Sequence, residues 1–421
     1  MLEDEVRLME SAWFMSYPYD LFRRLRNEAP VFHSERDGIW AITKYDDVRA
    51  ISKSPQRFAN GYHVFCSAAG LPVDEALDSS GPLPPSAEAR RRSQQGPSGT
   101  DSLVMADGER HAFLRKLASY AFTPRAVAKL EAEVEVLANE MFDRIEPDTE
   151  VDFIDAVAAP VPIVMIARLL GVPEEDSGLF RAWSDAFSEL GDDSLTSDGA
   201  RFEGRLGLVN DFNDYFRAAL HERKLDPRDD LLTAMVQAEW EGKPLADEEL
   251  LMMVTIFLIA GNETTRGLLS GTGKQLAEHP DQREILRGDL SLVPNAVEEL
   301  LRIVSPVTHM CRTALDDTEI RGVAIPKGAY LCLLYPAANR DEDIWDRADD
   351  LDVTRTPDPT HVAFGFAEHF CLGAQLARRE ARIVVNGLLE RFSSWDIVGD
   401  VTRAANHMTP GITKMPVVFH T

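Results

Sequence analysis

One cysteine in the chain, Cys371, stands in a segment whose composition suits a metal-bound thiolate. The segment reads Phe364-Gly365-Phe366-Ala367-Glu368-His369-Phe370-Cys371-Leu372-Gly373-Ala374-Gln375-Leu376-Ala377-Arg378. A thiolate is an anion that apolar surroundings alone disfavour, so it needs compensating dipoles. The unpaired N–H groups and the positive dipole end at a helix start supply them. We therefore predict a helix beginning just after the cysteine, with backbone donors from Leu372, Gly373 and Ala374 around the sulfur.

The same residues also fit a plainer structure. A cysteine beside a histidine is most often a small buried hydrophobe with a polar neighbour. A zinc site is not favoured, because the chain has no C-x-x-C or H-x₃-H pair and its other cysteines, Cys66, Cys311 and Cys332, are scattered singly.

The whole run resembles the haem-binding loop of the cytochrome P-450 superfamily, F-G-x-G-x-H-x-C-x-G-x-x-L-A-R, and departs from it only at Ala367, which replaces the second glycine. The resemblance implies that Cys371 is the proximal thiolate ligand of the iron in haem b, with O₂ as co-substrate. It also places Phe364, His369 and Gly373 at the cofactor. If the backbone at residue 367 needs a positive φ, an alanine there is strained.

A second segment fits the same resemblance. It is Ala260-Gly261-Asn262-Glu263-Thr264-Thr265, after an apolar stretch at 250–259 that is too short to span a bilayer and indicates a buried helix. These polar residues are also compatible with simple helix irregularity, since threonine hydroxyls bond back to carbonyls one turn earlier. The resemblance instead implies a widened turn with O₂ beside Ala260 and Gly261. Thr264 would then donate a hydrogen bond to oxygen during its activation, and Glu263 would relay protons from solvent.

A third segment, Glu299-Leu300-Leu301-Arg302, sets an acid and a base three residues apart on one helix face. An ordinary exposed ion pair of that kind contributes about 0–1 kcal/mol. In the resembled family the pair is buried on the proximal side of the haem and is completed by a later arginine. Arg355 stands at that place, and the expected role of the three residues is structural.

The last of these segments contains His111 and Arg115, which are four residues apart and so share a helical face. Without the other motifs, a solvated helix face would be the ordinary interpretation. The resemblance implies that this pair, with Arg312 and His369, binds the two haem propionates.

The organisation of the chain follows from these positions. With 421 residues and 44% apolar content the chain can bury a large core, and we expect one domain over 1–421. The clearest helices are predicted at 130–145, 247–276 and 374–392, and short strands at 38–42 and 330–334. This mainly α pattern with a small β-rich subdomain suits the family's fold, a helical prism around a buried haem.

Residues 60–104 depart from a compact pattern, since this stretch is rich in Gly, Pro, Ser and Ala. Such composition is typical of a solvated insertion. In the resembled family the loop at this position roofs the substrate pocket, so Tyr62, Val64 and Phe65 are candidates to touch substrate, with Arg90-Arg91-Arg92 available to an anionic group. Two further pocket candidates are Val307 and Ile412.

Composition excludes several partner classes. The 70 acidic and 44 basic side chains give a net charge of −26, which repels nucleic acid and anionic lipid surfaces. The first residues are acidic and show no signal peptide or anchor helix, so no stable membrane anchor is expected. Four cysteines, one of them committed to iron, suggest a reducing cytoplasm. A basic patch at Lys116, Arg378 and Arg379 is a candidate docking site for an acidic ferredoxin.

We therefore predict a haem-thiolate monooxygenase that inserts one atom of O₂ into a C–H bond of a hydrophobic small molecule, with electrons from NAD(P)H through ferredoxin reductase and ferredoxin. A sterol, branched lipid or terpenoid is the favoured substrate. The main alternative is a tailoring hydroxylase or epoxidase acting on a polyketide, peptide or aromatic scaffold. A peroxide-driven peroxygenase and a non-catalytic haem-binding protein are alternatives of other classes, although the retained Glu263-Thr264 pair disfavours both.

Overall fold

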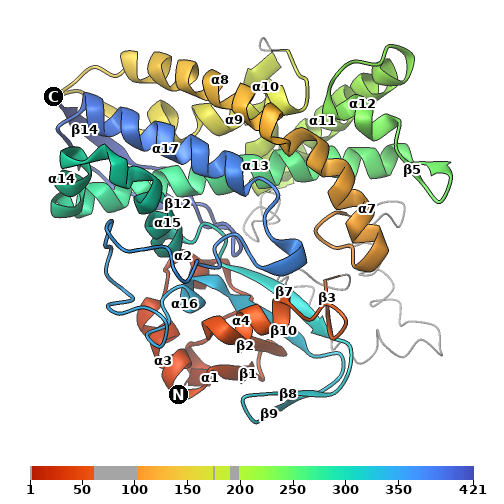
Figure 1. Ribbon diagram of the computed structural model, residues 1–421, viewed down its shortest axis with the longest axis vertical. Helices are drawn as coiled ribbons and strands as arrows, with labels where there is room; N and C mark the ends of the chain where they lie inside the picture. Colours follow the sequence, from red (N-terminus) through yellow and green to blue (C-terminus); the bar gives the residue numbers. More distant parts are fainter. Residues whose placement is uncertain (1, 61–101, 174–175, 190–198) are drawn as a thin grey trace.

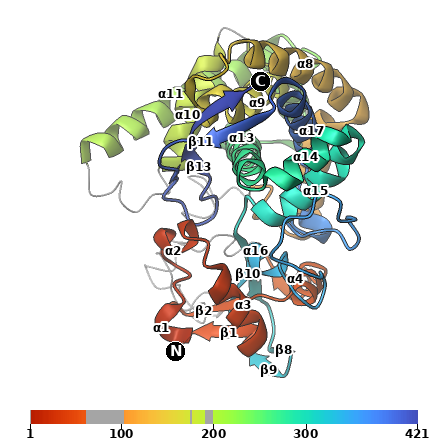
Figure 2. The ribbon, with the colours of Figure 1, turned by 90° about the vertical axis from the view of Figure 1, so that its left-hand side faces the viewer.

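The structure is a computed structural model, and it describes residues 2–60, 102–173, 176–189 and 199–421. A layer of long helices lies above a smaller part built on a sheet, and the two parts are seen edge-on in Figure 2. The N-terminus lies in the sheet-containing part and the C-terminus among the helices (Figure 1). The mainly α architecture with a small β-rich part agrees with the fold predicted from the sequence.

Most of the described chain is helical. The helices are α1 (Leu2–Glu5), α2 (Ser11–Met15), α3 (Tyr19–Glu28), α4 (Tyr45–Ser52), α7 (Gly108–Ala118), α8 (Pro124–Asp143), α9 (Pro160–Leu169), α10 (Ser177–Glu189), α11 (Gly199–Leu225), α12 (Leu231–Val236), α13 (Asp247–Glu278), α14 (Pro280–Gly288), α15 (Val293–Val304), α16 (Tyr335–Ala338) and α17 (Ala374–Arg391). Short helical turns are η1 (Ser119–Phe122), η2 (Ile154–Ala158), η5 (Leu290–Leu292) and η6 (Ala367–His369).

The strands are short and form several small sheets. They are β1 (Val31–Ser34), β2 (Ile39–Ile42), β3 (Phe58–Ala59), β4 (Glu150–Asp152), β5 (Glu239–Trp240), β6 (Lys243–Pro244), β7 (His309–Ala314), β8 (Thr318–Ile320), β9 (Val323–Ile325), β10 (Tyr330–Leu334), β11 (Ser394–Ile397), β12 (Thr402–Arg403), β13 (Ile412–Lys414) and β14 (Pro416–His420). The largest sheet has the order β1-β2-β10-β7-β3, in which only β2 and β10 run parallel.

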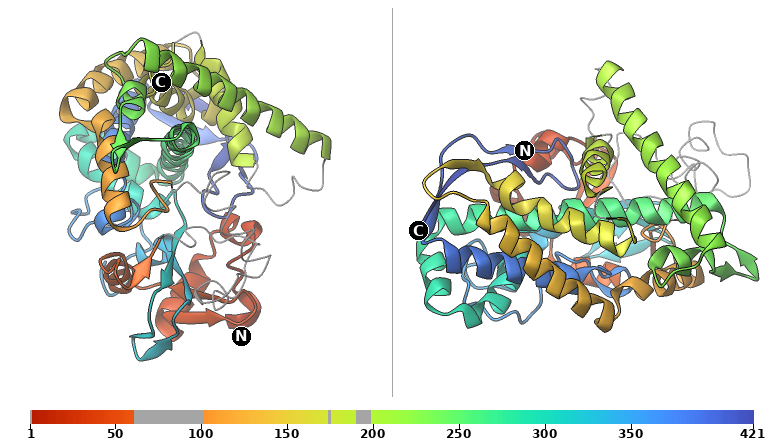
Figure 3. Two further views of the ribbon diagram at one scale, coloured as in Figure 1. Left: turned by 90° about the vertical axis from the view of Figure 1, so that its right-hand side faces the viewer. Right: turned by 90° about the horizontal axis from the view of Figure 1, so that it is seen from above.

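Helix α13 runs through the centre of the helical layer. Its apolar residues, among them Leu250, Val254 and Leu258, are buried in the largest hydrophobic cluster. It packs against α9, α10, α15 and α17, and α17 in turn packs against α8 (Figure 3, right). Glu249 supports the start of α13, since its carboxylate accepts the backbone N–H of Ala246 at 2.8 Å. No described helix has both the length and the apolar character needed to cross a membrane.

The predicted elements agree closely with the observed ones. The helix predicted from residue 247 ends two residues later than expected, and the helix after Cys371 covers Ala374–Arg391. The helix predicted at 130–145 begins earlier, at Pro124, and ends at Asp143. The ends of the 60–104 stretch meet, because the side-chain amide of Asn60 donates to the carbonyl of Val104 at 3.0 Å.

Candidate functional site

The cysteine loop is closed by its own backbone. The N–H of Cys371 donates to the carbonyl of Phe364 at 2.8 Å, and the Phe364 and Phe370 rings lie 6.0 Å apart. Burial raises the pKa of the Cys371 thiol, while backbone hydrogen bonds from Gly373 and Ala374 lower it in part. Two of the three expected backbone donors therefore face the sulfur. Cys371 nevertheless keeps exposed surface, as expected of a residue that borders a binding site.

Ala367 adopts φ +60°, a left-handed conformation that disfavours any residue with a Cβ. Gly365 in the same loop has φ +70° without that cost. A glycine at position 367 would therefore adopt this backbone conformation at a lower cost than the alanine does. Gly373, by contrast, has φ −82°, and a Cβ there would meet the Phe122 ring only at an ordinary 3.7 Å. Neither the backbone conformation nor a described protein contact requires glycine at position 373.

Four basic side chains gather near this loop from three separate elements. His111 and Arg115 come from α7, Arg312 from β7 and His369 from η6. The His111 and His369 rings lie 4.1 Å apart, and Arg115 donates to the carbonyl of Phe370 at 2.7 Å. Burial lowers the pKa of His369 to about 2, and the charges of Arg312, His111 and Arg115 lower it further. The sequence thus predicted a group of residues that the fold does bring together.

The Nε2 atoms of His111 and His369 are buried without a hydrogen-bond partner among the described residues, and the carboxylate of Asp107 lies 3.9 Å from Nε2 of His369. Buried polar atoms are normally paired, so this gap indicates a missing acceptor. The nearby Glu368 carboxylate completes a trio whose possible ligand atoms lie within 4.8 Å of one another. A metal cation would fit the trio alone, but the adjacent arginines disfavour a cation and favour an anion. The arrangement therefore fits the propionates of a haem bound at Cys371.

On α13, Ala260 and Thr264 retain exposed surface, while their neighbours Asn262 and Glu263 are buried. The Thr264 hydroxyl donates to the Ala260 carbonyl at 2.6 Å. The helix is continuous from Asp247 to Glu278, so the predicted widened turn is not observed. The bond from the Thr264 hydroxyl to the Ala260 carbonyl is thus made within a regular helix.

Gly261 serves helix packing in this structure. A Cβ at this position would lie 2.6 Å from Cδ1 of Ile166 on α9. Glycine thus allows α9 and α13 to approach closely, a requirement that the sequence alone did not reveal.

Glu263 is held in a buried polar network toward α10. Its carboxylate accepts from Arg266 at 2.5 Å and from the Ser184 hydroxyl at 3.2 Å. Arg266 also binds the partly exposed Asp185 at 3.0 Å. Burial raises the pKa of Glu263, although the Arg266 charge opposes this effect. Sequence reasoning missed Arg266, Ser184 and Asp185. Only Arg266 left a signal, because it follows Glu263 at the same three-residue spacing as Glu299 and Arg302.

Glu299, Arg302 and Arg355 form one buried ion-pair network. Arg302 binds the Glu299 carboxylate through two nitrogens at 2.7 and 2.8 Å, and Arg355 reaches it at 3.1 Å. Arg302 further donates to the carbonyls of Ala348 and Asp350. Both charges of the Glu299–Arg302 pair are thus compensated in the interior.

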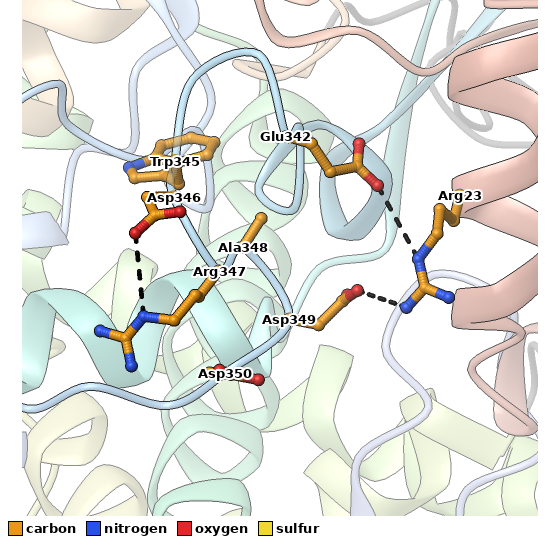
Figure 4. A pocket seen from close by; sticks show the side chains of 8 residues that line it. All are labelled: Arg23, Glu342, Trp345, Asp346, Arg347, Ala348, Asp349 and Asp350. Carbon is orange, nitrogen blue, oxygen red and sulfur yellow. Dashed lines mark hydrogen bonds and ion pairs between the residues drawn. The ribbon is translucent and has the colours of Figure 1, made fainter.

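A surface groove of about 440 Å³ is lined in part by Ala348 and Asp350, whose carbonyls bind Arg302 (Figure 4). Its lining residues are Arg23, Glu342, Trp345, Asp346, Arg347, Ala348, Asp349 and Asp350. Arg23 is ion-paired across it with Glu342 and Asp349. Because these charges satisfy one another, we interpret the groove as part of the scaffold.

The basic patch predicted from the sequence is largely neutralised. Arg378 binds Glu298 at 2.6 and 2.9 Å and lies over the Phe364 ring, and Arg379 is ion-paired with Glu131. Only Lys116 of the three predicted residues is exposed. Carboxylates on neighbouring helices, which the linear sequence does not place, account for the difference.

The candidate substrate residues are spread over the chain. Tyr62, Val64, Phe65 and the arginines at 90–92 lie outside the described residues. Val307 is partly buried and packs on the sheet-side cluster. Ile412 is buried and borders a crevice of about 40 Å³ beside Gly267 and Pro306. The structure does not bring Val307 and Ile412 to Cys371 through any described contact.

Comparison with known proteins gives a consistent result. Residues 202–417 match the family model described as Cytochrome P450. The chain is 34% identical to a steroid C26-monooxygenase of Mycobacterium tuberculosis, over 94% of this chain and 92% of the relative. It is 32% identical to the polyketide biosynthesis cytochrome P450 PksS of Bacillus subtilis, over 96% of each chain, and 31% identical to a linalool 8-monooxygenase of Pseudomonas putida, over 96% and 95%.

The fold agrees as well. The ligand-free structure of cytochrome P450 TbtJ1 superposes with a TM-score of 0.79 at 32% identity, covering 98% of this chain and 99% of that one. Together with the cysteine loop and its cluster of basic side chains, these similarities show that the chain belongs to the cytochrome P450 family of haem b-containing monooxygenases, which use O₂.

Proposed function

We propose that this P450 hydroxylates a hydrophobic small molecule of the sterol, branched-lipid or terpenoid class, with electrons from NAD(P)H delivered through ferredoxin reductase and ferredoxin. The steroid and linalool monooxygenases among its relatives support this class. Each relative aligns over more than nine-tenths of the chain, so the likeness extends beyond the cofactor loop.

The observation that carries an oxygenase function is the polar network behind Thr264. Glu263, buried beside the threonine, is linked through Arg266 to Asp185, which is partly exposed. Burial raises the pKa of the Glu263 carboxyl against the opposing charge of Arg266, and a carboxyl group is chemically suited to pass a proton to a neighbouring hydroxyl. We assign Glu263 and Thr264 the delivery of protons from solvent to the reaction site.

Residues of the cysteine loop, α7 and β7 would hold the cofactor. When bound, haem supplies the iron at which O₂ is activated. Cys371 would ligate that iron, and the Gly373 and Ala374 N–H groups would share the thiolate charge. His111, Arg115, Arg312 and His369 would bind the propionates, which supply the acceptors that the two buried imidazole nitrogens lack.

A tailoring role in natural-product biosynthesis is the second candidate, and the likeness to the polyketide P450 PksS favours it. Both candidates share the same chemistry and differ only in the substrate.

Titration of the ferric holoprotein with sterols, terpenoids, fatty acids, macrolides and small aromatics tests this assignment. The readout is the change in the Soret band when a substrate displaces water from the iron. A saturable change confined to sterols or terpenoids is expected. A change confined to macrolides would establish the tailoring function, and product formed with peroxide but not with ferredoxin and reductase would contradict the proposed electron supply.

A further inference from the structure

Three potential metal ligands that are scattered in the sequence converge within the largest sheet. His309 and Cys311 are two residues apart on β7 and therefore share one face. Cys332 on β10 lies directly opposite Cys311 in the antiparallel register. The two sulfurs and one imidazole nitrogen lie within 4.8 Å of one another, and all three side chains are buried. Figure 1 shows β7 and β10 side by side in the sheet-containing part of the molecule.

The His309 ring packs against two neighbouring rings. Its centroid lies 4.7 Å from that of Phe14 on α2 and 5.4 Å from that of His407, and the Phe14 and His407 centroids are 6.5 Å apart. This packing restricts the orientation of a ligand ring before any ion arrives, as preorganised metal sites require.

Hydrogen bonding at Thr308 indicates which tautomer the His309 ring adopts. Its single hydroxyl proton goes to the carbonyl of His407 at 2.6 Å. The same oxygen lies 2.9 Å from Nδ1 of His309, so it accepts the Nδ1–H. Nε2 then carries the lone pair.

We propose that His309, Cys311 and Cys332 form a Zn²⁺ site that is separate from the haem. Two thiolates and one neutral imidazole suit a borderline-soft cation. Binding releases the two thiol protons to solvent. The divalent charge then cancels both thiolates, whereas a monovalent ion such as Cu⁺ would leave a net negative charge in this apolar cluster.

The expected role of the ion is structural. Cys311 and Cys332 belong to the cluster of buried apolar side chains that includes Phe14, through which α2 and α3 pack against the sheet. Arg312, a proposed propionate ligand, follows Cys311 on the same strand. Zinc would thus fix the strand that carries Arg312 without touching the cofactor.

Metal analysis of the untagged holoprotein by inductively coupled plasma mass spectrometry tests the proposal, with haem iron as internal standard. About one zinc per chain is expected, either as purified or after incubation with ZnCl₂ and desalting. Zinc-edge X-ray absorption should show two sulfur neighbours at about 2.3 Å and nitrogen at about 2.0 Å. Zinc below about one-tenth per chain in both preparations, or a zinc edge with only nitrogen and oxygen neighbours, would overturn it.

Variants add a second readout. Cys332→Ser should lower bound zinc at least about tenfold while the thiolate-type spectrum of the ferrous CO complex stays unchanged. His33→Asn, which alters an exposed histidine elsewhere in the same sheet, should bind zinc as the wild type does. Retention of full zinc by both Cys332→Ser and His309→Asn, or a Cys311–Cys332 disulfide in peptide mass spectra of the native protein, would contradict the site.

Discussion

The rings of His111 and His369 lie 4.1 Å apart, and the buried Nε2 atom of each has no hydrogen-bond partner among the residues that the structure describes. The two histidines come from α7 and from the turn before Cys371, which are more than 250 residues apart in the chain. A pair of buried donors without an acceptor is costly, at about 1–3 kcal/mol each. An anionic group bound between them and the neighbouring arginines would recover that free energy.

Removal of one of these donors should therefore weaken cofactor binding. We expect His369→Ala to lower haem affinity about 10- to 100-fold, because one charge-assisted hydrogen bond contributes about 1.5–3 kcal/mol. Haem transfer to apomyoglobin measures this change. The control His33→Ala, at an exposed histidine, should transfer haem at the wild-type rate. Equal transfer rates for the wild type and His369→Ala would show that this histidine does not hold a propionate.

Thr264→Ala should uncouple oxygen consumption from product formation. The variant loses the hydroxyl that bonds the Ala260 carbonyl, and with it the proposed proton donor, so product per NAD(P)H should fall by about tenfold. The matched control is Thr255→Ala. Thr255 lies on the same helix, and its hydroxyl donates an equivalent hydrogen bond to the carbonyl four residues earlier, that of Leu251, at 2.9 Å. If Thr264→Ala formed as much product per NAD(P)H as the wild type and Thr255→Ala, the proposed role of Thr264 would be wrong.

Ala367→Gly should stabilise the protein by up to about 1 kcal/mol, since it relieves the strain of an alanine at φ +60°. Urea denaturation of the holoprotein measures the change. Ala112→Gly, at an exposed position within α7, should have the opposite effect and cost about 1 kcal/mol. Destabilisation by both changes would indicate that the alanine methyl makes contacts that outweigh the backbone strain.

Glu298→Gln should lower stability in a pH-dependent way. Burial alone raises the pKa of Glu298, but the His361 ring 3.4 Å away and two hydrogen bonds from Arg378 outweigh it and lower the pKa to about 2. A carboxyl with a lowered pKa stabilises the fold above its unfolded pKa and loses that contribution as the pH falls through its folded pKa. The wild type should therefore exceed the variant by up to about 3 kcal/mol above pH 5, and the gap should shrink between pH 5 and pH 2.

Urea unfolding at several pH values measures this gap. Glu284→Gln is the control, because Glu284 forms only an exposed i,i+3 pair with Arg287 and should contribute less than about 1 kcal/mol at any pH. A gap that is the same at pH 7 and pH 3 would exclude the charge of Glu298 as its source.

The sequence predicted the features that local patterns encode. The cysteine loop, the helices around it and the polar segment of α13 each have a distinctive run of residues, and the i,i+4 spacing placed His111 and Arg115 on one face. The convergence of those two with Arg312 and His369 came from family resemblance, since no local pattern links β7 to α7.

Long-range partners were beyond sequence reasoning. The carboxylates that neutralise Arg378 and Arg379 come from α15 and α8, and Ser184 approaches Glu263 only because α10 packs on α13. Cys311 and Cys332 looked isolated for the same reason, because strand register rather than spacing brings them together. The role of Gly261 in helix packing depends on Ile166 of another helix.

The most direct test of the account is the absorption spectrum of the reduced CO complex of the wild type, Cys371→Ser and Cys332→Ser. The thiolate of Cys371 is the proposed iron ligand, so the wild type and Cys332→Ser should both give the red-shifted Soret band of a thiolate-ligated haem, and Cys371→Ser should lose it. A red-shifted band that survives in Cys371→Ser would contradict the central assignment of this site.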